Sequence, residues 1–161
     1  AGVAGQNAAA VAVGMGADVT LLDTNLDKLR DAGRRWGGRV HTVASSALAV
    51  REQVTAADLV IGRAGAITLT EIEATGKCSI LIPSPNVAEN HQFHNAMALV
   101  NRDAAVMIEE KDLTGEKLWE TVNTVLSEPG RAEEIGKNAK AMAVLDANDR
   151  IYNIICEKAK K

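Results

Sequence analysis

Two separate segments of the chain carry residue types that suit binding of a nucleotide. The first is Gly2-Val3-Ala4-Gly5, which fits the last two glycines of a G-x-G-x-x-G fingerprint. In that fingerprint the backbone approaches a pyrophosphate at a helix N-terminus. Asp23 follows about 20 residues later, where a carboxylate accepts from both ribose hydroxyls and repels a 2′-phosphate. This segment predicts a partial, weak site for NAD, although a glycine-tolerant turn beside a solvated aspartate would have the same spacing.

The second segment is Arg63-Ala64-Gly65-Ala66-Ile67, with Glu71 one turn further along an expected helix. Gly65 would let a nucleotide approach the backbone where the helix starts, and a helix N-terminus favours negative charge. The Glu71 carboxylate could accept hydrogen bonds from both hydroxyls of a ribose. This segment suits a nucleotide-sugar, and the alternative is that Glu71 is a surface residue of the helix.

Other reactive side chains form no recognisable set. His91 and His94 are three residues apart and could share a helix face with Glu89, but a third strong metal ligand is not evident, so no metal site is predicted. Cys78 and Cys156 are far apart in sequence and are expected to be reduced thiols. No Ser/His/Asp or Cys/His set can be assembled, so no catalytic residue is predicted.

The elements that must position these residues alternate between short β-branched runs and longer helical stretches. Helices are predicted over 5–16, 25–36, 47–55, 67–75, 90–101, 114–127, 131–143 and 148–159, and strands over 18–22, 39–43, 57–61, 79–82 and 104–108. This alternation implies βαβ units. The predicted fold is therefore α/β, a Rossmann-like three-layer αβα sandwich with a mainly parallel sheet. A single domain is expected over 1–161, with a dinucleotide-type half (1–62) and a nucleotide-sugar-type half (63–161).

One strand of this fold is not found in the sequence. In a dinucleotide-binding βαβ unit, the glycine turn follows a strand at the centre of the sheet. This chain starts at the turn, so the first strand is expected to be missing at the N-terminus. Without it, the strands over 18–22 and 57–61 would lose their common neighbour.

Composition narrows the class of protein. The 161 residues are 47% apolar and 24% charged, which is ordinary for one globular domain. Aromatic residues are 2%, so the core is expected to consist of Ala, Val, Leu and Ile. The net charge of −3, without a basic stripe, argues against nucleic-acid binding. No apolar run is long enough for a membrane span and no signal peptide is recognised, so a cytoplasmic location is expected. Formation of a homodimer stays open.

The first third of the chain carries a specific run of motifs. These are Gly5-Gln6-Asn7-Ala8-Ala9, Gly14-Met15-Gly16-Ala17-Asp18-Val19-Thr20, Leu21-Leu22-Asp23-Thr24-Asn25-Leu26, Arg39-Val40-His41-Thr42 and Ala57-Asp58-Leu59-Val60-Ile61-Gly62. In them, residues 1–62 resemble the NAD-binding domain of alanine dehydrogenases. The resemblance stops at Gly62, where that family has a nicotinamide-facing loop. The family's substrate-binding and proton-transfer residues lie on another domain and have no counterpart here.

A different set of motifs covers the last two thirds of the chain. It consists of Arg63-Ala64-Gly65-Ala66, Thr68, Glu71, Ile82-Pro83-Ser84-Pro85, Asn90-His91-Gln92, Asn95-Ala96 and Ala104-Ala105-Val106-Met107-Ile108. From about Ala57 onward the chain resembles the C-terminal, donor-binding domain of MurG-type peptidoglycan glycosyltransferases, which use UDP-N-acetylglucosamine. The resemblance assigns Glu71 to the ribose, and Gln92 with Asn95 to sugar hydroxyls, for which amides are suited. That family's separate N-terminal domain, which holds the acceptor lipid and the candidate base, has no counterpart here.

Each resemblance ends where the other begins, at Ala57–Arg63. Both families have a strand of the Ala-Asp-Leu-Val-Ile type there, so a splice at this strand would preserve the sheet. The sequence is therefore interpreted as a recombined or designed chimera with partial NAD and UDP-N-acetylglucosamine sites and no complete catalytic machinery. The alternatives are the donor-binding part of a MurG-like glycosyltransferase, the NAD-binding part of an alanine-dehydrogenase-like oxidoreductase, and a structural protein without a ligand.

Overall fold

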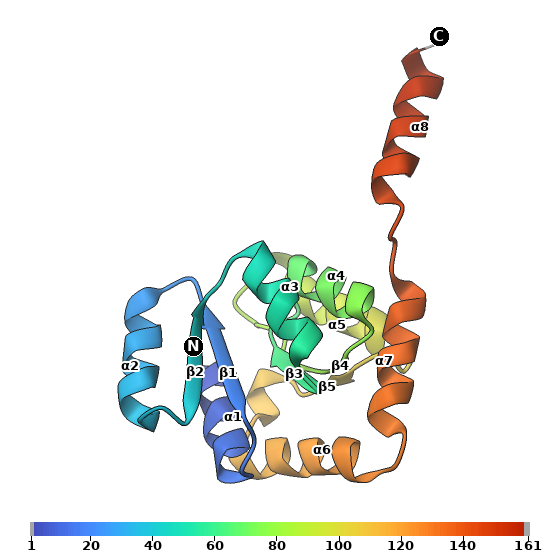
Figure 1. Ribbon diagram of the computed structural model, residues 1–161. Coiled ribbons are helices and arrows are strands. Elements are labelled where there is room, and N and C mark those ends of the chain that lie inside the picture. The colour runs from blue at the N-terminus through green and yellow to red at the C-terminus, as the bar shows by residue number, and fades with distance from the viewer. Residues whose placement is uncertain (1, 160–161) are drawn as a thin grey trace.

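Helices and strands alternate along the chain in the predicted order (Figure 1). The computed structural model describes residues 2–159. In chain order the elements are α1 (Val3–Gly14), β1 (Val19–Asp23), α2 (Leu26–Trp36), β2 (Val40–Ala44), α3 (Ala47–Ala56), β3 (Leu59–Gly62), α4 (Ala66–Thr75), β4 (Cys78–Leu81), the 3-10 turn η1 (Ala88–Asn90), α5 (His91–Val100), β5 (Val106–Met107), the 3-10 turn η2 (Glu110–Asp112), α6 (Gly115–Ser127), α7 (Arg131–Met142) and α8 (Ala147–Ala159). Every predicted helix and strand is present, and its bounds are shifted by no more than about two residues.

Local capping fixes several helix ends at the residues that the sequence indicates. The Asn25 side chain accepts from the backbone N–H groups of Asp27 and Lys28, which caps the start of α2. Gly37 ends α2, and Gly76 ends α4, both in the left-handed region with φ of 55° and 68°. A side chain is disfavoured in that region, so glycine is the expected residue at these two helix ends.

The strands of the described residues form two separate parallel sheets. One contains β1 and β2, and the other has the order β3-β4-β5. Strands β1 and β3 do not pair, and α1 contacts both of them from one side. Within the described residues the two sheets therefore share no strand, as expected if β1 and β3 have lost a common neighbour. The strand that was expected to be missing would lie outside the described residues.

The larger sheet is covered on both faces, which confirms the αβα layering. Ile80 of β4 packs in a cluster with residues of α1 and α6, namely Ala8, Leu118 and Val122. The next residue, Leu81, packs on the opposite face with residues of α4 and α5, including Ile72 and Leu99. In the view of Figure 1, α4 and α5 lie above this sheet and α6 lies below it. Alternation of side chains along a strand produces the two faces.

A smaller cluster holds the first sheet against α1 and α2. It contains Leu21, Leu29, Trp36 and Val40, together with small alanines. The core is aliphatic as predicted, apart from Trp36, which is buried. Met15, just after α1, is exposed. It follows the last helical residue, Gly14, so it no longer points along the buried face of α1.

The last helix, α8, contributes no residue to the core. It extends away from the other elements in Figure 1, and none of its described residues is buried. No helix of the described chain is both long and apolar enough to span a bilayer.

Candidate functional site

The turn between β3 and α4 has free space beside its backbone. Arg63, Ala64 and Gly65 form this turn, and α4 begins at Ala66. Gly65 is the N-cap of α4 and provides no side-chain cap. A Cβ built at Gly65 would find no atom within 4 Å. The first N–H groups of a helix have no partner within the helix. Space for a ligand therefore adjoins backbone donors that favour an anion.

Arg63 joins this turn to two other loops. Its Nη1 donates to the carbonyl oxygens of Ile82 and Pro83, at 3.1 and 3.3 Å, and to the Oε2 atom of Glu110. Strands β3, β4 and β5 run parallel, so the segments that follow them meet at one edge of the sheet. The Arg63 guanidinium thus fixes the carboxyl-end loops of all three strands against each other.

The two predicted amides also hold these loops. Gln92 Oε1 accepts from the backbone N–H of Ser84 at 2.9 Å, and Asn95 Nδ2 donates to the carbonyl oxygen of Ala64 at 3.2 Å. Within the described chain, Gln92 Nε2 and Asn95 Oδ1 make no hydrogen bond. Each amide therefore has one end fixed by a loop and presents its other polar atom for a hydroxyl group.

Hydrogen bonds bring together only part of the predicted nucleotide-sugar set. Arg63 and Ala64 lie in the bonded loops described above, and Gln92 and Asn95 bond to these loops from α5. Glu71 is partly buried on α4, and Ile67, one turn before it, is largely exposed. Residues four apart share a helix face, so Ile67 and Glu71 line the same side of α4 beyond the open turn.

The dinucleotide set is divided between the start of α1 and the end of β1. Gly2 is the N-cap of α1 in extended conformation, and Val3, Ala4 and Gly5 already belong to the helix. A Cβ at Gly5 would stand 3.7 Å from Leu21 of β1, which is an ordinary contact. The helix begins earlier than expected because only Gly2 departs from helical geometry.

Asp23 is the last residue of β1 and accepts from the N–H of Asn25 at 2.8 Å through Oδ1. This bond shapes the turn between β1 and α2. The structure therefore places Asp23 at a carboxyl end, as predicted, but on a different sheet from Arg63 and Gly65.

The histidines and cysteines provide no reactive cluster in residues 2–159. His91 Nδ1 lies 2.9 Å from the carbonyl oxygen of Ala88, and the ring of His94 packs edge-on against Phe93. No group of three potential ligands is close enough to hold a metal in this part of the chain. Burial raises the pKa of Cys78 to about 11, so its thiol stays protonated at neutral pH.

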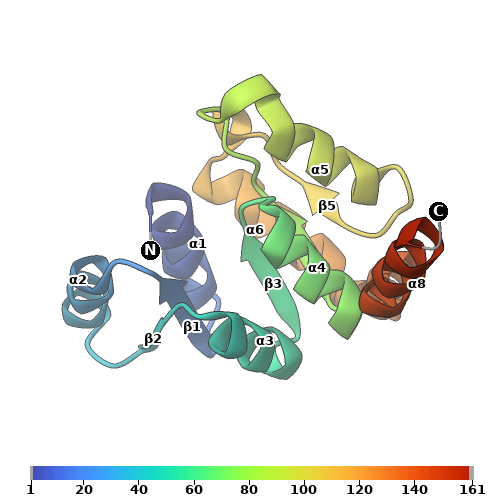
Figure 2. The same ribbon diagram turned by 90° about the horizontal axis from the view of Figure 1, so that it is seen from above.

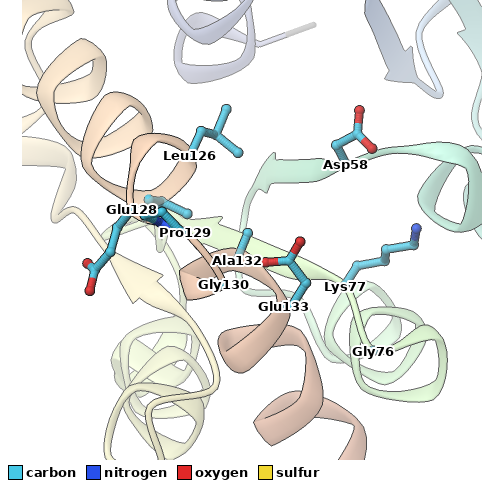
Figure 3. A pocket seen from close by; sticks show the side chains of 10 residues that line it. Asp58, Gly76, Lys77, Leu126, Glu128, Pro129, Gly130, Ala132 and Glu133 are labelled. Atoms are coloured by element: carbon cyan, nitrogen blue, oxygen red, sulfur yellow. The ribbon is translucent and has the colours of Figure 1, made fainter.

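Two hollows lie at opposite edges of the larger sheet. The larger one, about 480 Å³, is lined by Asp58, Gly76, Lys77, Val125, Leu126, Glu128, Pro129, Gly130, Ala132 and Glu133 (Figure 3). Asp58 and Lys77 precede β3 and β4, so this hollow lies at the amino ends of the strands. The smaller one, about 310 Å³, is lined by Pro83, Pro85, Asn90, Phe93, Glu109, Glu110 and Lys111 at the carboxyl ends. Parallel sheets bind ligands at their carboxyl ends, so only the smaller hollow adjoins the candidate site.

Glu110 was not among the residues predicted from the sequence. This residue is the first of η2, shortly after the strand β5, and pairs with Arg63, which is far away in sequence. Its position as an acidic residue at the carboxyl end of a strand is a signal of the same kind as Asp23. Nothing in the sequence alone indicates that its partner is Arg63.

Comparison with protein families places most of the chain in one family. Residues 20–151 match the glycosyltransferase family 28 C-terminal domain. A UDP-N-acetylglucosamine–N-acetylmuramyl-(pentapeptide) pyrophosphoryl-undecaprenol N-acetylglucosamine transferase of Acetivibrio thermocellus is 49% identical over 102 residues, which are 63% of this chain and 28% of that enzyme. The enzyme of the same name from Desulfitobacterium hafniense strain Y51 is 40% identical over 136 residues, 84% of this chain and 37% of that enzyme. The chain thus spans about a third of the length of these relatives.

Two solved structures share the fold. The chain superposes on Acinetobacter baumannii MurG with a TM-score of 0.72 at 20% identity, covering 94% of this chain and 44% of that one. It superposes on the glycosyltransferase VinC, solved with dTDP, with a TM-score of 0.68 at 18% identity, covering 95% and 37% of the two chains. These likenesses establish the Rossmann-like architecture of the chain.

The family match continues through the strand at which two parents were expected to join. It begins at residue 20, well before Ala57–Arg63, and extends beyond it to residue 151. The 136-residue alignment is likewise too long to lie wholly behind Ala57. Both observations favour a single family on the two sides of β3, and neither gives support to the resemblance of residues 1–62 to alanine dehydrogenases.

Proposed function

The chain belongs to the glycosyltransferase family 28 C-terminal domain family, and from this membership we propose that it binds the sugar-nucleotide donor of a glycosyltransferase. The proposed donor is UDP-N-acetylglucosamine, because the relatives named above are N-acetylglucosamine transferases that carry this nucleotide sugar in their names. The carboxyl-end loops of β3, β4 and β5 would form the donor site.

The observation that carries this proposal is the open turn at Gly65. Beside it, the side-chain amides of Gln92 and Asn95 each have one polar atom bonded to a loop and one left for a ligand. The uncovered N-terminus of α4 suits the diphosphate. Glu71 would accept from the ribose hydroxyls, and the exposed Ile67 would provide apolar contact one turn earlier. The free ends of Gln92 and Asn95 would bind sugar hydroxyls, because an amide can both donate and accept.

Binding without transfer is the activity expected of this chain by itself. No Ser/His/Asp or Cys/His set is present in its sequence, and the candidate base of the resembling family lies on a separate domain. The donor site would therefore present the sugar to an acceptor and a base held elsewhere. Transfer of N-acetylglucosamine by this chain alone would contradict this assignment.

A second candidate is weak NAD binding at Gly2, Val3, Ala4, Gly5 and Asp23. The specific observation in its favour is the place of Asp23 in the fold. Asp23 stands at the carboxyl end of β1, where a ribose carboxylate belongs. NAD binding would fit a chimeric origin of residues 1–62. The family match through β3 favours the donor-binding function over NAD binding.

Calorimetric titration with UDP, UDP-N-acetylglucosamine and NAD separates these functions. We expect UDP and UDP-N-acetylglucosamine to bind, and NAD to bind more weakly. Replacing Glu71 by Gln removes a charged acceptor for two hydroxyls, and hydrogen bonds to charged groups contribute about 1.5–3 kcal/mol each. The affinity for UDP should fall by about tenfold or more, since about 1.4 kcal/mol is one factor of ten.

Glu52→Gln is the matched control for this titration, because Glu52 is exposed on α3 and away from the carboxyl-end loops. It removes the same charge and should leave the affinity for UDP unchanged. Equal affinities of the Glu71→Gln variant and the wild type would remove Glu71 from the site. Tighter binding of NAD than of UDP would favour the second candidate.

A further inference from the structure

Glu110 occupies the centre of the loops that form the proposed donor site, yet it offers no group suited to an anionic donor. We propose that Glu110 is a positioning residue, which acts through Arg63 to hold the Gly65 turn in the conformation that binds nucleotide. This role rests on the donor-binding function proposed above. It assigns a task to a residue outside the predicted ligand contacts.

The geometry gives Arg63 two kinds of partner. Its Nη1 reaches two carbonyl oxygens of the segment after β4 and one carboxylate oxygen of the segment after β5. The side chains of Arg63 and Glu110 are 37% and 34% exposed, so the pair is partly shielded from water. Shielding strengthens an ion pair relative to one on an open surface.

Loss of the Glu110 carboxylate would remove the negative charge that pairs with the Arg63 guanidinium. Among the described residues, two backbone carbonyls would then be the acceptors left for a guanidinium that is partly shielded from water. A cation in this setting gains by turning outward into solvent. Since Arg63 is the first residue of the Gly65 turn, its departure would release this turn from the loop that contains Pro83.

The released loops also contain the hydrogen-bond partners of the two amides, which lie on α5. Ala64, next to Arg63, is bonded to Asn95, and Ser84, next to Pro83, is bonded to Gln92. Arg63 therefore connects two loops that are each connected to α5. When this connection opens, the free ends of Gln92 and Asn95 no longer have a fixed position relative to Gly65. Affinity then falls with the fraction of molecules in which the loops are correctly placed.

The direction of the change in UDP affinity distinguishes a positioning role from electrostatic repulsion of the diphosphate by Glu110. A carboxylate near a diphosphate repels it, so removing the charge of Glu110 would by electrostatics alone tighten binding of UDP. Removing a positioning residue weakens binding. The variant Glu110→Gln keeps the shape of the side chain and therefore tests both effects with opposite expected outcomes.

The experiment is calorimetric titration of UDP into the wild type, Glu110→Gln and Glu116→Gln. Glu116 is exposed in the first turn of α6 and has the same charge, so it controls for net charge. We expect about a tenfold higher Kd for Glu110→Gln, which corresponds to about one molecule in ten with the loops in place. Glu116→Gln should change the Kd by less than about twofold. The double variant Arg63→Gln, Glu110→Gln should bind no more weakly than Arg63→Gln alone, because both residues act as one unit.

A ligand-free measurement tests the loops themselves. The Ser84 N–H is held by Gln92, so its hydrogen exchange should be faster in Glu110→Gln than in the wild type, while exchange in the β4 core is unchanged. A Glu110→Gln variant that binds UDP as tightly as a binding-competent wild type, or more tightly, overturns the positioning role. A wild type that binds no UDP overturns the donor-binding function, and with it the role of Glu110 in binding. Unchanged exchange at Ser84 overturns the proposed loop release in either case.

Discussion

Gly136 lies inside α7 where this helix crosses the end of α4, and alanine at this position should destabilise the protein. A Cβ at Gly136 would stand 2.3 Å from the carbonyl oxygen of Gly76. An ordinary contact is about 3.5 Å, so one of the two backbones must move by roughly 1 Å. Gly76 is held by its N–H bonds to the carbonyls of Ile72 and Glu73 and by its left-handed conformation. The displacement must therefore be taken up between α4 and α7.

The cost can be estimated from three contributions. Overpacking of a dense core costs about 1–3 kcal/mol. Separating α7 from α4 weakens the packing of the fully buried Ile135 and Ala139, which adds about 1–2 kcal/mol. Alanine in place of glycine in a helix returns about 1 kcal/mol. We expect a net loss of about 1–4 kcal/mol, which lowers the Tm by about 2–16 °C for a domain of this size.

Gly33 provides the matched control, because it is also a helix-interior glycine. It lies within α2, and a Cβ there would meet no atom within 4 Å. The same replacement should therefore stabilise the protein by about 0.5–1 kcal/mol. Thermal and urea denaturation followed by far-UV circular dichroism give both values. If Gly136→Ala is as stable as the wild type, the close approach of α7 to Gly76 is incorrect.

Two further predictions concern titratable side chains. The bidentate pair with Arg131 lowers the pKa of Asp103, so its contribution to stability is present at neutral pH and is lost as the pH falls below about 4, through the folded-state pKa. Asp103→Asn should therefore lower stability at neutral pH and flatten its decline in acid, as measured by urea unfolding at several pH values; an unchanged acid slope would rule out this pair as a contributor. Iodoacetamide at mildly alkaline pH should modify Cys156, which is partly exposed, and should leave Cys78 unmodified until the chain is denatured, because burial raises the pKa of that thiol to about 11. Mass spectrometry after digestion distinguishes the two sites, and labelling of native Cys78 would contradict its burial.

Part of the candidate site could be predicted from the sequence. Gly65 could be identified because a glycine before a helical run, after an apolar strand, is typical of a backbone that approaches a ligand. Gln92 and Asn95 came only from the resemblance to a family, since two amides on a helix have no distinctive spacing. The structure adds that each amide has one end committed to a loop, which determines the atom left for a ligand.

The dinucleotide segment shows what a short local pattern leaves open. Gly2 and Gly5 have the spacing of the fingerprint, and the structure places Gly2 at the N-cap of α1 and Gly5 in its first turn. A short glycine motif specifies conformational freedom and leaves the conformation to its surroundings. The expected change of family at Ala57–Arg63 was based on two resemblances that meet at a strand of a type found in both families. The family match through β3 favours one family on both sides.

By itself, the sequence determined the order of helices and strands, the α/β class and the helix ends at Asn25, Gly37 and Gly76. These features depend on hydrophobic periodicity and on capping, which act between residues close together in the chain. Only the tertiary structure decided that Arg63 meets Glu110 and that β1 and β3 do not pair. Those contacts depend on how parallel strands align at the edges of a sheet, so residues far apart in sequence become neighbours without leaving a local signal.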